Sequence, residues 1–232
     1  MNTAIILAGG IGSRMNLNCP KQYLMMNNKP IFHYCLQTFQ NHNAIDKIIV
    51  VLSNEWHSYV KEYVEKHNFS KICGYALAGK TRQHSIYNGL KFIEKNLSDT
   101  EVCIIHDAVR PFVSNALITN SVNGAFEKDG AMPVIKVKDT IYCSENGECI
   151  DSLLNRNILF AGQSPESFNF RKYIKIHHDV SDEEITNTTG SSEIAYGHGM
   201  NIKLITGDEE NFKITTIEDL KKFESIVKKN GR

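Results

Sequence analysis

Residues 5–15 read IILAGGIGSRM, and PKQ follows at residues 20–22. A short apolar run leads into three closely spaced glycines, and Arg14 and Lys21 come next. Glycine lets main-chain N–H groups approach a ligand closely, and amides at a helix N-terminus favour phosphate oxygens. The stretch therefore predicts a strand that ends in an anion site, for which we favour a nucleoside triphosphate. The alternative is an ordinary tight turn between a strand and a helix.

The rest of the chain repeats this pattern of a buried strand followed by an amphipathic helix. Near-continuous Ile/Val runs separated by helices indicate a parallel sheet that is covered on both faces. We therefore expect an α/β fold in a single domain over residues 1–232, with a mostly parallel, doubly wound (Rossmann-like) sheet. Strands are predicted at residues 3–8, 47–52, 72–78, 102–106 and 131–137, and helices at 30–39, 56–67, 81–95 and 115–126.

The pattern changes over residues 139–164, where short alternating runs flank Asn146-Gly147. Asn-Gly between such runs is a strong hairpin signal. We expect a projecting β-arm within the domain that is too small to have its own core and therefore packs against another subunit. Beyond it we predict a helix over residues 168–178, a polar loop over 182–192, a strand over 201–206 and a helix over 216–227.

The composition excludes several classes of protein. The 232 residues carry no formal net charge, so there is no electrostatic footprint for nucleic acid or for an anionic membrane. No apolar run approaches the length that spans a bilayer, and the first residues lack the pattern of a signal peptide. The six cysteines show no zinc-ligand spacing, and Cys73 and Cys103 lie in apolar runs. We therefore expect a cytoplasmic protein with reduced thiols.

Two further segments follow predicted strands. Gly79, Arg82 and Ser85 could offer a turn, a cation and a hydroxyl to a base or ribose, although an N-capped surface helix is the plain alternative. Asp107 ends a strand where a carboxylate can hold Mg²⁺ against triphosphate oxygens, and Arg110 can reach a second anion. The alternative is a turn-capping aspartate with an arginine as its ion-pair partner.

Residues 74–81, GYALAGKT, satisfy the phosphate-loop pattern G-x-x-x-x-G-K-[ST]. That motif needs a loop after a strand, and here the middle of the motif has the composition of the strand itself. A nucleotide hydrolase that uses Lys80 and Thr81 is therefore an alternative of a different class. A non-catalytic nucleotide-binding module is a third possibility.

Taken together, these blocks resemble the CTP-dependent cytidylyltransferases that act on 2-C-methyl-erythritol 4-phosphate and on ribitol 5-phosphate. The resemblance covers nearly the whole chain. The motifs that carry it are LAGGIGSRM (7–15), PKQYL (20–24), GKTR (79–82) with Ser85 and Asn88-Gly89, HDAVRP (106–111), Asp139-Thr140, GQSP (162–165) and NFKIT (211–215).

The resemblance implies a homodimeric enzyme that uses CTP, Mg²⁺ and a phosphorylated polyol or sugar. The acceptor phosphate attacks the α-phosphate in line and pyrophosphate leaves, so positioning and charge neutralisation supply the rate. Thr140 and Arg156 come from the arm of the neighbouring subunit. The implied catalytic residues are Arg14, Lys21 and Lys213. The residues implied to bind the nucleotide are Leu7, Ala8, Gly9, Gly10, Gly12, Gly79, Arg82, Ser85 and Asp107, and Asp107 is also implied to hold the metal. The residues implied to bind the acceptor are Arg110, Thr140, Arg156 and Thr189.

Two segments depart from the family pattern. Residues 162–166 read GQSPE where the family usually has TQTPQ, and residues 189–192 read TGSS where it usually has Thr-Asp. The missing aspartate implies an altered acceptor pocket, in which Asn187 or Glu193 is a possible replacement. The Leu-Ala-Gly-Gly start, Val109 and Asn155-Arg156 resemble the ribitol-phosphate branch, which feeds cell-surface polymers. The isoprenoid branch and other polyol or sugar phosphates are the alternatives.

Overall fold

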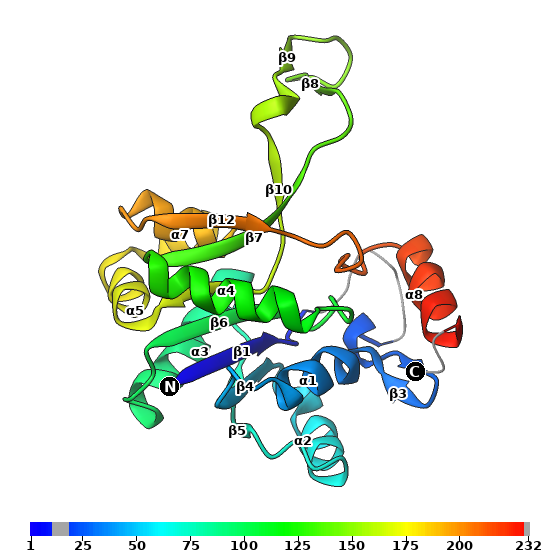
Figure 1. Cartoon of the computed structure of the whole chain (residues 1–232), viewed down its shortest axis with the longest axis vertical. Coiled ribbons are helices and arrows are strands. Elements are labelled where there is room, and N and C mark those ends of the chain that lie inside the picture. Colours follow the sequence, from blue (N-terminus) through cyan, green and yellow to red (C-terminus); the bar gives the residue numbers. More distant parts are fainter. Residues whose placement is uncertain (11–18, 230–232) are drawn as a thin grey trace.

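The computed structural model describes residues 1–10 and 19–229. The centre of the sheet is parallel: β1 (Asn2–Leu7) lies between β4 (Lys47–Leu52) and β6 (Val102–Asp107), and β5 (Ile72–Leu77) lies beyond β4. In this register Leu7 is opposite Asp107, so both strands end at the same edge. The predicted mostly parallel α/β sheet is confirmed (Figure 1).

The other half of the sheet is built around β7 (Gly130–Lys136). The strand β12 (Ile202–Thr206) pairs with it in parallel, whereas β10 (Phe160–Gly162) and β11 (Glu166–Asn169) pair with it antiparallel. Strand β11 also pairs antiparallel with β6. The prediction that a helix begins at residue 168 is wrong, because Phe168 is a fully buried strand residue and the helix begins two residues later.

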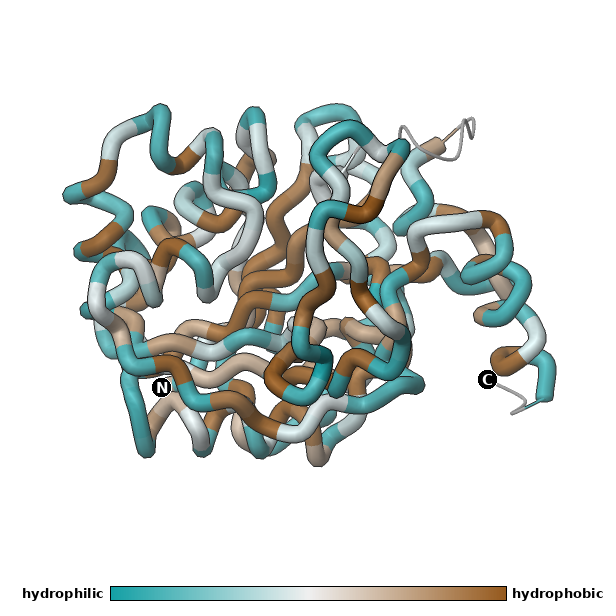
Figure 2. The backbone as a smooth tube through the Cα atoms, turned by 90° about the horizontal axis from the view of Figure 1, so that it is seen from above, coloured by the Kyte–Doolittle hydropathy of each residue, from teal (hydrophilic) through white to brown (hydrophobic). Residues whose placement is uncertain are grey.

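Helices cover both faces of the sheet, and alternate residues of each strand face different helix layers. One core contains Ile6 with α1 (Ile31–Asn41), α2 (His57–Lys66) and α4 (Asn115–Glu127). The second contains Ile5 with α3 (Arg82–Asn96), α5 (Phe170–Asp179) and α7 (Ser191–Gly197). Figure 2 shows the hydrophobic strands at the centre of the molecule. Burial on both faces explains why the strands are continuous apolar runs.

The last helix, α8 (Ile217–Lys229), packs on α1 through an edge-to-face contact of Phe223 with Tyr34. Asp219 N–H donates to Thr216 Oγ1, and the Asp219 carboxylate accepts from Thr216 N–H. This reciprocal cap defines the start of the helix. The smaller elements near the N-terminal half are η2 (Lys21–Tyr23), β2 (Met25–Met26), β3 (Lys29–Pro30) and η3 (Asn54–Trp56).

The polar loop predicted over residues 182–192 is wrong. The chain forms α6 (Asp182–Asn187) there and then enters α7. Ser181 caps α6 by accepting from Glu184 N–H, and Ile185 is the one buried residue of that helix. Helices this short and polar show almost no apolar periodicity, so a pattern search does not detect them.

Between β7 and β10 the chain leaves the body as the arm, which we define as residues 138–159. It contains β8 (Ile141–Cys143) paired antiparallel with β9 (Ser152–Leu154), followed by η4 (Arg156–Ile158). Figure 1 shows it projecting far from the sheet, as predicted. The arm ends earlier than residue 164, because Phe160–Gly162 already pairs with β7.

Candidate active site

A pocket of about 420 Å³ opens where β1, β5 and β6 end. Parallel sheets bind ligands at this carboxyl edge. A larger hollow of about 790 Å³ lies at the opposite edge, but none of its ionisable side chains is buried. The carboxyl-edge pocket is lined by the predicted residues Leu7, Gly9, Gly10, Lys21, Gly79, Arg82, Ser85, Asp107 and Lys213, and by Gln22, Lys80, Thr81 and Val109.

Two glycines allow the backbone loops of the pocket to pack closely. A Cβ atom on Gly9 would lie 2.3 Å from Ala78 Cβ, and one on Gly79 would lie 2.3 Å from His84 Cβ. Ser85 Oγ accepts a hydrogen bond from Gly79 N–H and donates one to Thr81 O, each at 3.0 Å. Gly79 and Ser85 therefore form one closed turn at the start of α3.

The PKQ motif holds the first glycine loop. Gln22 Nε2 donates to the carbonyls of Ala8 and Gly10, and the Tyr23 hydroxyl donates to Ala8 O. Ala8 itself is buried in the core and does not line the pocket. Lys21 is buried to 8% exposure and lines the pocket. The predicted Gly12 and Arg14 lie outside the described residues.

Asp107 lies at the centre of the charged groups. Its carboxylate accepts from Arg82 Nε at 3.1 Å and lies 2.9 Å from Lys213 Nζ and 3.8 Å from Arg110 Nε. Burial alone would raise the pKa of Asp107, but the positive charges of Arg82, Lys213 and Arg110 outweigh burial and hold that pKa far below its usual value. Asp107 is therefore ionised and keeps three cations close together.

Arg82 is shared among several partners. Besides Asp107, its guanidinium donates to Ser191 Oγ at 2.6 Å and to Glu166 Oε1 at 3.4 Å. Burial opposes the charge, yet Asp107 and Glu166 raise the pKa of Arg82 above its usual value. Arg82 was predicted to bind nucleotide; it lines the pocket, but its nitrogens are engaged by the protein.

The loop after β12 brings Lys213 to the pocket. Gln163 exchanges two hydrogen bonds with the backbone of Asp208, and Asn211 Nδ2 donates to Ser164 O at 2.7 Å. Arg110 in turn donates to Asn211 O at 2.7 Å. The GQSP and NFKIT motifs are therefore joined in space. Arg110 borders Asp107 but does not line the pocket itself.

The remaining predicted acceptor residues lie outside the pocket of their own chain. Thr189 donates through its N–H and Oγ1 to the Glu193 carboxylate, which also accepts from Gly190 N–H. The Glu193 side chain, in the first turn of α7, thus reaches back to the N-cap residue Gly190. Thr140 and Arg156 are exposed on the arm, where Arg156 donates to Lys138 O.

The phosphate-loop alternative at residues 74–81 is wrong. Residues 74–77 belong to β5, so no loop is present to surround a phosphate group. Lys80 is 82% exposed and forms a 4.0 Å ion pair with Asp182. Its neighbour Thr81 is the N-cap of α3 and accepts from His84 N–H. The motif is therefore a strand followed by a capped helix.

The described residues contain no cluster of three His, Cys, Asp or Glu side chains that could enclose a metal ion. Asp107 offers a single carboxylate in the pocket. Mg²⁺ is commonly held by one or two carboxylates together with substrate phosphates, so this donor set fits a metal that arrives with a nucleotide. No helix in the described part of the chain is long and apolar enough to cross a membrane.

Sequence reasoning assigned no role to Glu166 or Gln22. Glu166 was noticed only as a departure from the family pattern, and nothing in its sequence neighbourhood indicated that it contacts Arg82. Gln22 lies inside a quoted motif, but its bonds to Ala8 and Gly10 depend on the loop geometry.

A family model described as 2-C-methyl-D-erythritol 4-phosphate cytidylyltransferase, IspD, matches residues 2–229. A 2-C-methyl-D-erythritol 4-phosphate cytidylyltransferase of Clostridium botulinum (strain Loch Maree / Type A3) is 38% identical over 98% of both chains. A ribitol-5-phosphate cytidylyltransferase of Streptococcus agalactiae serotype Ia is 32% identical over 97% of this chain and 95% of that relative.

The fold also matches solved structures. The crystal structure of 4-diphosphocytidyl-2C-methyl-D-erythritol synthase from Anaerococcus prevotii superposes with a TM-score of 0.81. The two chains are 25% identical, and the match covers 98% of this chain and 96% of that one. The similarity therefore extends over the body and the arm together.

Proposed function

The chain belongs to the IspD family of CTP-dependent cytidylyltransferases, and we propose that it transfers CMP from CTP to D-ribitol 5-phosphate, giving CDP-ribitol and pyrophosphate. The family membership confirms the resemblance seen in the sequence. The product is an activated alditol of the kind used to build cell-surface polymers.

The observation that carries the proposal is the set of cations around Asp107. Lys213, Arg82 and Arg110 contact its carboxylate, and the buried Lys21 lines the same pocket. Holding several cations beside one carboxylate fixes their positions before the substrate binds. A pocket with this excess of positive charge suits a triphosphate and the negative charge that develops as pyrophosphate leaves.

In the proposed reaction, a phosphate oxygen of the acceptor attacks the α-phosphorus of CTP. A new P–O bond forms, the bond from the α-phosphorus to the bridging oxygen breaks, and that oxygen leaves with pyrophosphate. Lys21 and Lys213 stabilise the charge on the α-phosphate, and Arg110 binds the acceptor phosphate. The acceptor is already an anion, so no general base is required.

We propose Mg²⁺ as the metal. Asp107 would hold it together with the triphosphate, and the ion would neutralise charge on the phosphate oxygens. The other residues of the pocket position the reactants. The Gly9–Gly10 loop and the Gly79 turn would hold the nucleotide, and the arginine–carboxylate contacts keep the cations in place.

Support for ribitol 5-phosphate comes from the sequence around the pocket and on the arm, namely Leu7 to Gly10, Val109 and Asn155-Arg156. The second candidate is 2-C-methyl-D-erythritol 4-phosphate. It is favoured by the 38% identity to a relative that carries that name. Both acceptors are short polyol phosphates, so the pocket chemistry is the same for the two.

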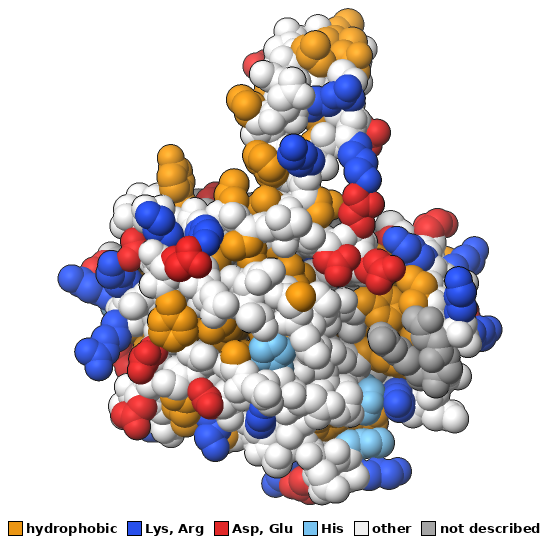
Figure 3. Space-filling model, viewed as in Figure 1, with side chains coloured by type: hydrophobic (Ala, Val, Ile, Leu, Met, Phe, Trp, Pro, Cys, Tyr) orange, Lys and Arg blue, Asp and Glu red, His pale blue; other side chains and the backbone are white. Residues whose placement is uncertain are grey.

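We also propose a homodimer in which the arm of one subunit completes the pocket of the other. Figure 3 shows hydrophobic side chains gathered at the tip of the arm. Ile150, Leu153 and Ile158 are each more than 60% exposed, which is unusual for side chains of this size. Burying them against a second copy would bring Thr140 and Arg156 to that copy's acceptor phosphate.

The cytoplasmic location stays a prediction from the cysteine pattern.

The proposed function is tested by incubating the protein with CTP, Mg²⁺ and a panel of acceptor phosphates while pyrophosphate release is measured. Ribitol 5-phosphate should give the largest kcat/KM. If 2-C-methyl-D-erythritol 4-phosphate is the better substrate, the second candidate is correct. No release with any alditol phosphate, despite CTP binding, would contradict the proposal and favour a non-catalytic nucleotide-binding module.

A further inference from the structure

Glu166 is a buried carboxylate at the first position of β11. Its side chain is 8% exposed, and the strand is fixed in register because Glu166 is opposite Ile105 of β6. Asp107 follows two residues later on that neighbouring strand. The backbone therefore places Glu166 rigidly beside the pocket, on the side of the sheet where α7 begins.

The two oxygens of Glu166 have different partners. Oε2 accepts from both the N–H and the Oγ of Ser192, at 3.0 and 2.7 Å. Oε1 accepts from Arg82 Nη2 at 3.4 Å. The side chain thus bridges the first turn of α7 and the guanidinium that contacts Asp107.

The first turn of α7 is itself anchored. Ser191 is fully buried, its Oγ accepts from Arg82 Nη1, and its carbonyl accepts from the Tyr173 hydroxyl of α5 at 3.2 Å. Arg82 is therefore held at three nitrogens: Nε by Asp107, Nη1 by Ser191 and Nη2 by Glu166. A guanidinium held on all sides has a fixed position relative to the pocket.

We infer that Glu166 is a positioning residue that clamps Arg82 against Asp107 and thereby sets the arrangement of cations in the nucleotide pocket. The family usually has glutamine at this position, but the contacts in this chain suit a carboxylate. Both of its ends face hydrogen-bond donors, whereas a glutamine amide has one acceptor and one donor end. A glutamine at this position would direct an NH₂ group at either Ser192 or Arg82. The inference rests on the cytidylyltransferase activity of the pocket.

The test is a double-mutant cycle. Glu166→Gln, which keeps the size of the side chain, should lower kcat by about 10- to 100-fold, because a small displacement of positioned groups is costly. In an Arg82→Lys background the same substitution should change kcat by less than about twofold, because the clamped group is already gone. Equal losses in the two backgrounds, or an unchanged kcat in Glu166→Gln, would overturn the inference.

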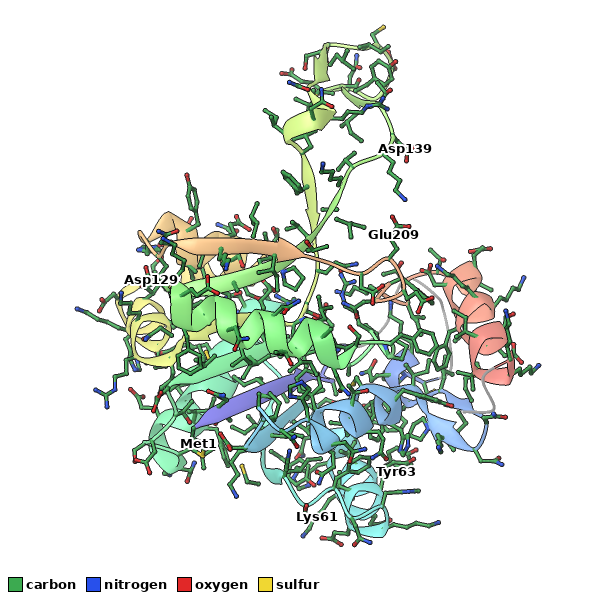
Figure 4. All side chains as sticks on the ribbon, in the orientation of Figure 1. Met1, Lys61, Tyr63, Asp129, Asp139 and Glu209 are labelled. Atoms are coloured by element: carbon green, nitrogen blue, oxygen red, sulfur yellow. The ribbon has the colours of Figure 1, made fainter. Side chains whose placement is uncertain are left out.

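Asp129→Asn is the matched control. Asp129 also uses its two oxygens for different donors, Lys172 Nζ and Asn201 N–H. It lies just before β7, at the edge of the sheet opposite the nucleotide pocket (Figure 4). This control should melt at a lower temperature than the native protein and keep the native kcat. A loss of kcat in Asp129→Asn as large as in Glu166→Gln would show a general stability effect and reject the clamp.

A second variant and a second measurement keep the inference testable if the first variant does not fold or if no acceptor is turned over. If Glu166→Gln does not fold, Ser192→Ala removes one donor to Oε2 and should lower kcat in the same direction, again only while Arg82 is present. If no acceptor supports turnover, CTP titrations with Mg²⁺ replace kcat. Glu166→Gln should then weaken CTP binding only in the Arg82 protein, whereas tighter binding, expected from simple loss of a negative charge, would overturn the clamp.

Discussion

The pocket and the arm contrast in how far a single chain completes them. In the pocket, charged side chains from β6, α3 and the loop after β12 already contact one another, with the buried Asp107 in the middle. On the arm, large apolar side chains and Arg156 are exposed, and the hairpin has no core of its own. Figure 4 shows Asp139 on the lower part of the arm, with Glu209 of the body below it and the other labelled residues farther away. The first region is pre-organised within one chain, and in the proposed homodimer the second is completed by a partner.

The two regions are nevertheless connected at the base of the arm. Lys138 forms an ion pair with Glu209, and Gln163 holds the backbone of Asp208 just after the arm returns to the sheet. Both contacts involve the loop that carries Lys213. The nucleotide pocket is therefore built by the body, and we propose that the arm completes the acceptor site of a second subunit.

The largest effect is expected in the pocket. Lys213→Ala removes a cation that contacts Asp107, and we expect kcat to fall by about 10²- to 10³-fold, as when one preorganised electrostatic group is lost. Pyrophosphate release under saturating CTP measures this. Lys203→Ala is the matched control, because Lys203 is similarly exposed and pairs with Glu127 at a distance from the pocket. If Lys213→Ala keeps more than about one tenth of the native kcat, Lys213 does not act on the reacting phosphate.

A smaller effect is expected on the stability of the body when the pH is lowered. His177 is 1% exposed; its Nδ1 donates to Tyr173 O, and burial lowers its pKa to about 4. The unfolded chain binds this proton near pH 6.5, so the stabilisation is present above pH 6.5 and is lost as the pH falls towards 4. The free energy of unfolding should fall by about 3 kcal/mol over this range through His177 alone.

Urea unfolding at pH 7, 5.5 and 4 measures this loss, and His177→Gln should show a correspondingly weaker dependence on pH. The arm holds no buried histidine, so the pH dependence belongs to the body. An identical dependence in the native protein and in His177→Gln would show that other groups are responsible.

The smallest expected change is a partial recovery of activity when two inactive variants exchange subunits, and it tests the contrast most directly. Arg156→Ala and Lys21→Ala should each be nearly inactive alone. After subunit exchange, mixed dimers contain one site with both defects and one intact site, so a 1:1 mixture should recover about one quarter of the native activity. Two inactive variants that exchange subunits without recovery would show that each pocket is completed by its own chain.

Much of the architecture was predictable from the sequence because the signals were local. The apolar runs of β1, β4 and β6 are buried on both faces, and the Asn146-Gly147 turn indicated the hairpin of the arm. The two short helices over residues 182–197 and the strand β11 were missed. Their residues are stabilised by caps and by pairing with β6 and β7, which are distant in sequence.

For the site, the sequence predicted most of the residues that line the pocket, because they lie in the family motifs, most of which stand at or after the ends of predicted strands. Their mutual contacts were not predictable. Ala8 belongs to the core, and Arg82 is held by protein groups on three sides. Glu166 joins the set only because antiparallel pairing places β11 next to β6.

The sequence by itself determined the fold class, the family and the nucleotide chemistry, because strand periodicity, glycine spacing and motif order are properties of consecutive residues. The tertiary structure decided which charges meet. Asp107 lies near Arg82, Glu166 and Lys213 only after four separate segments converge at one sheet edge. The stretch at residues 5–15 predicts an anion site, but two of the cations in that site, Arg82 and Lys213, come from segments far from Asp107 in the sequence, and only the folded chain brings them together.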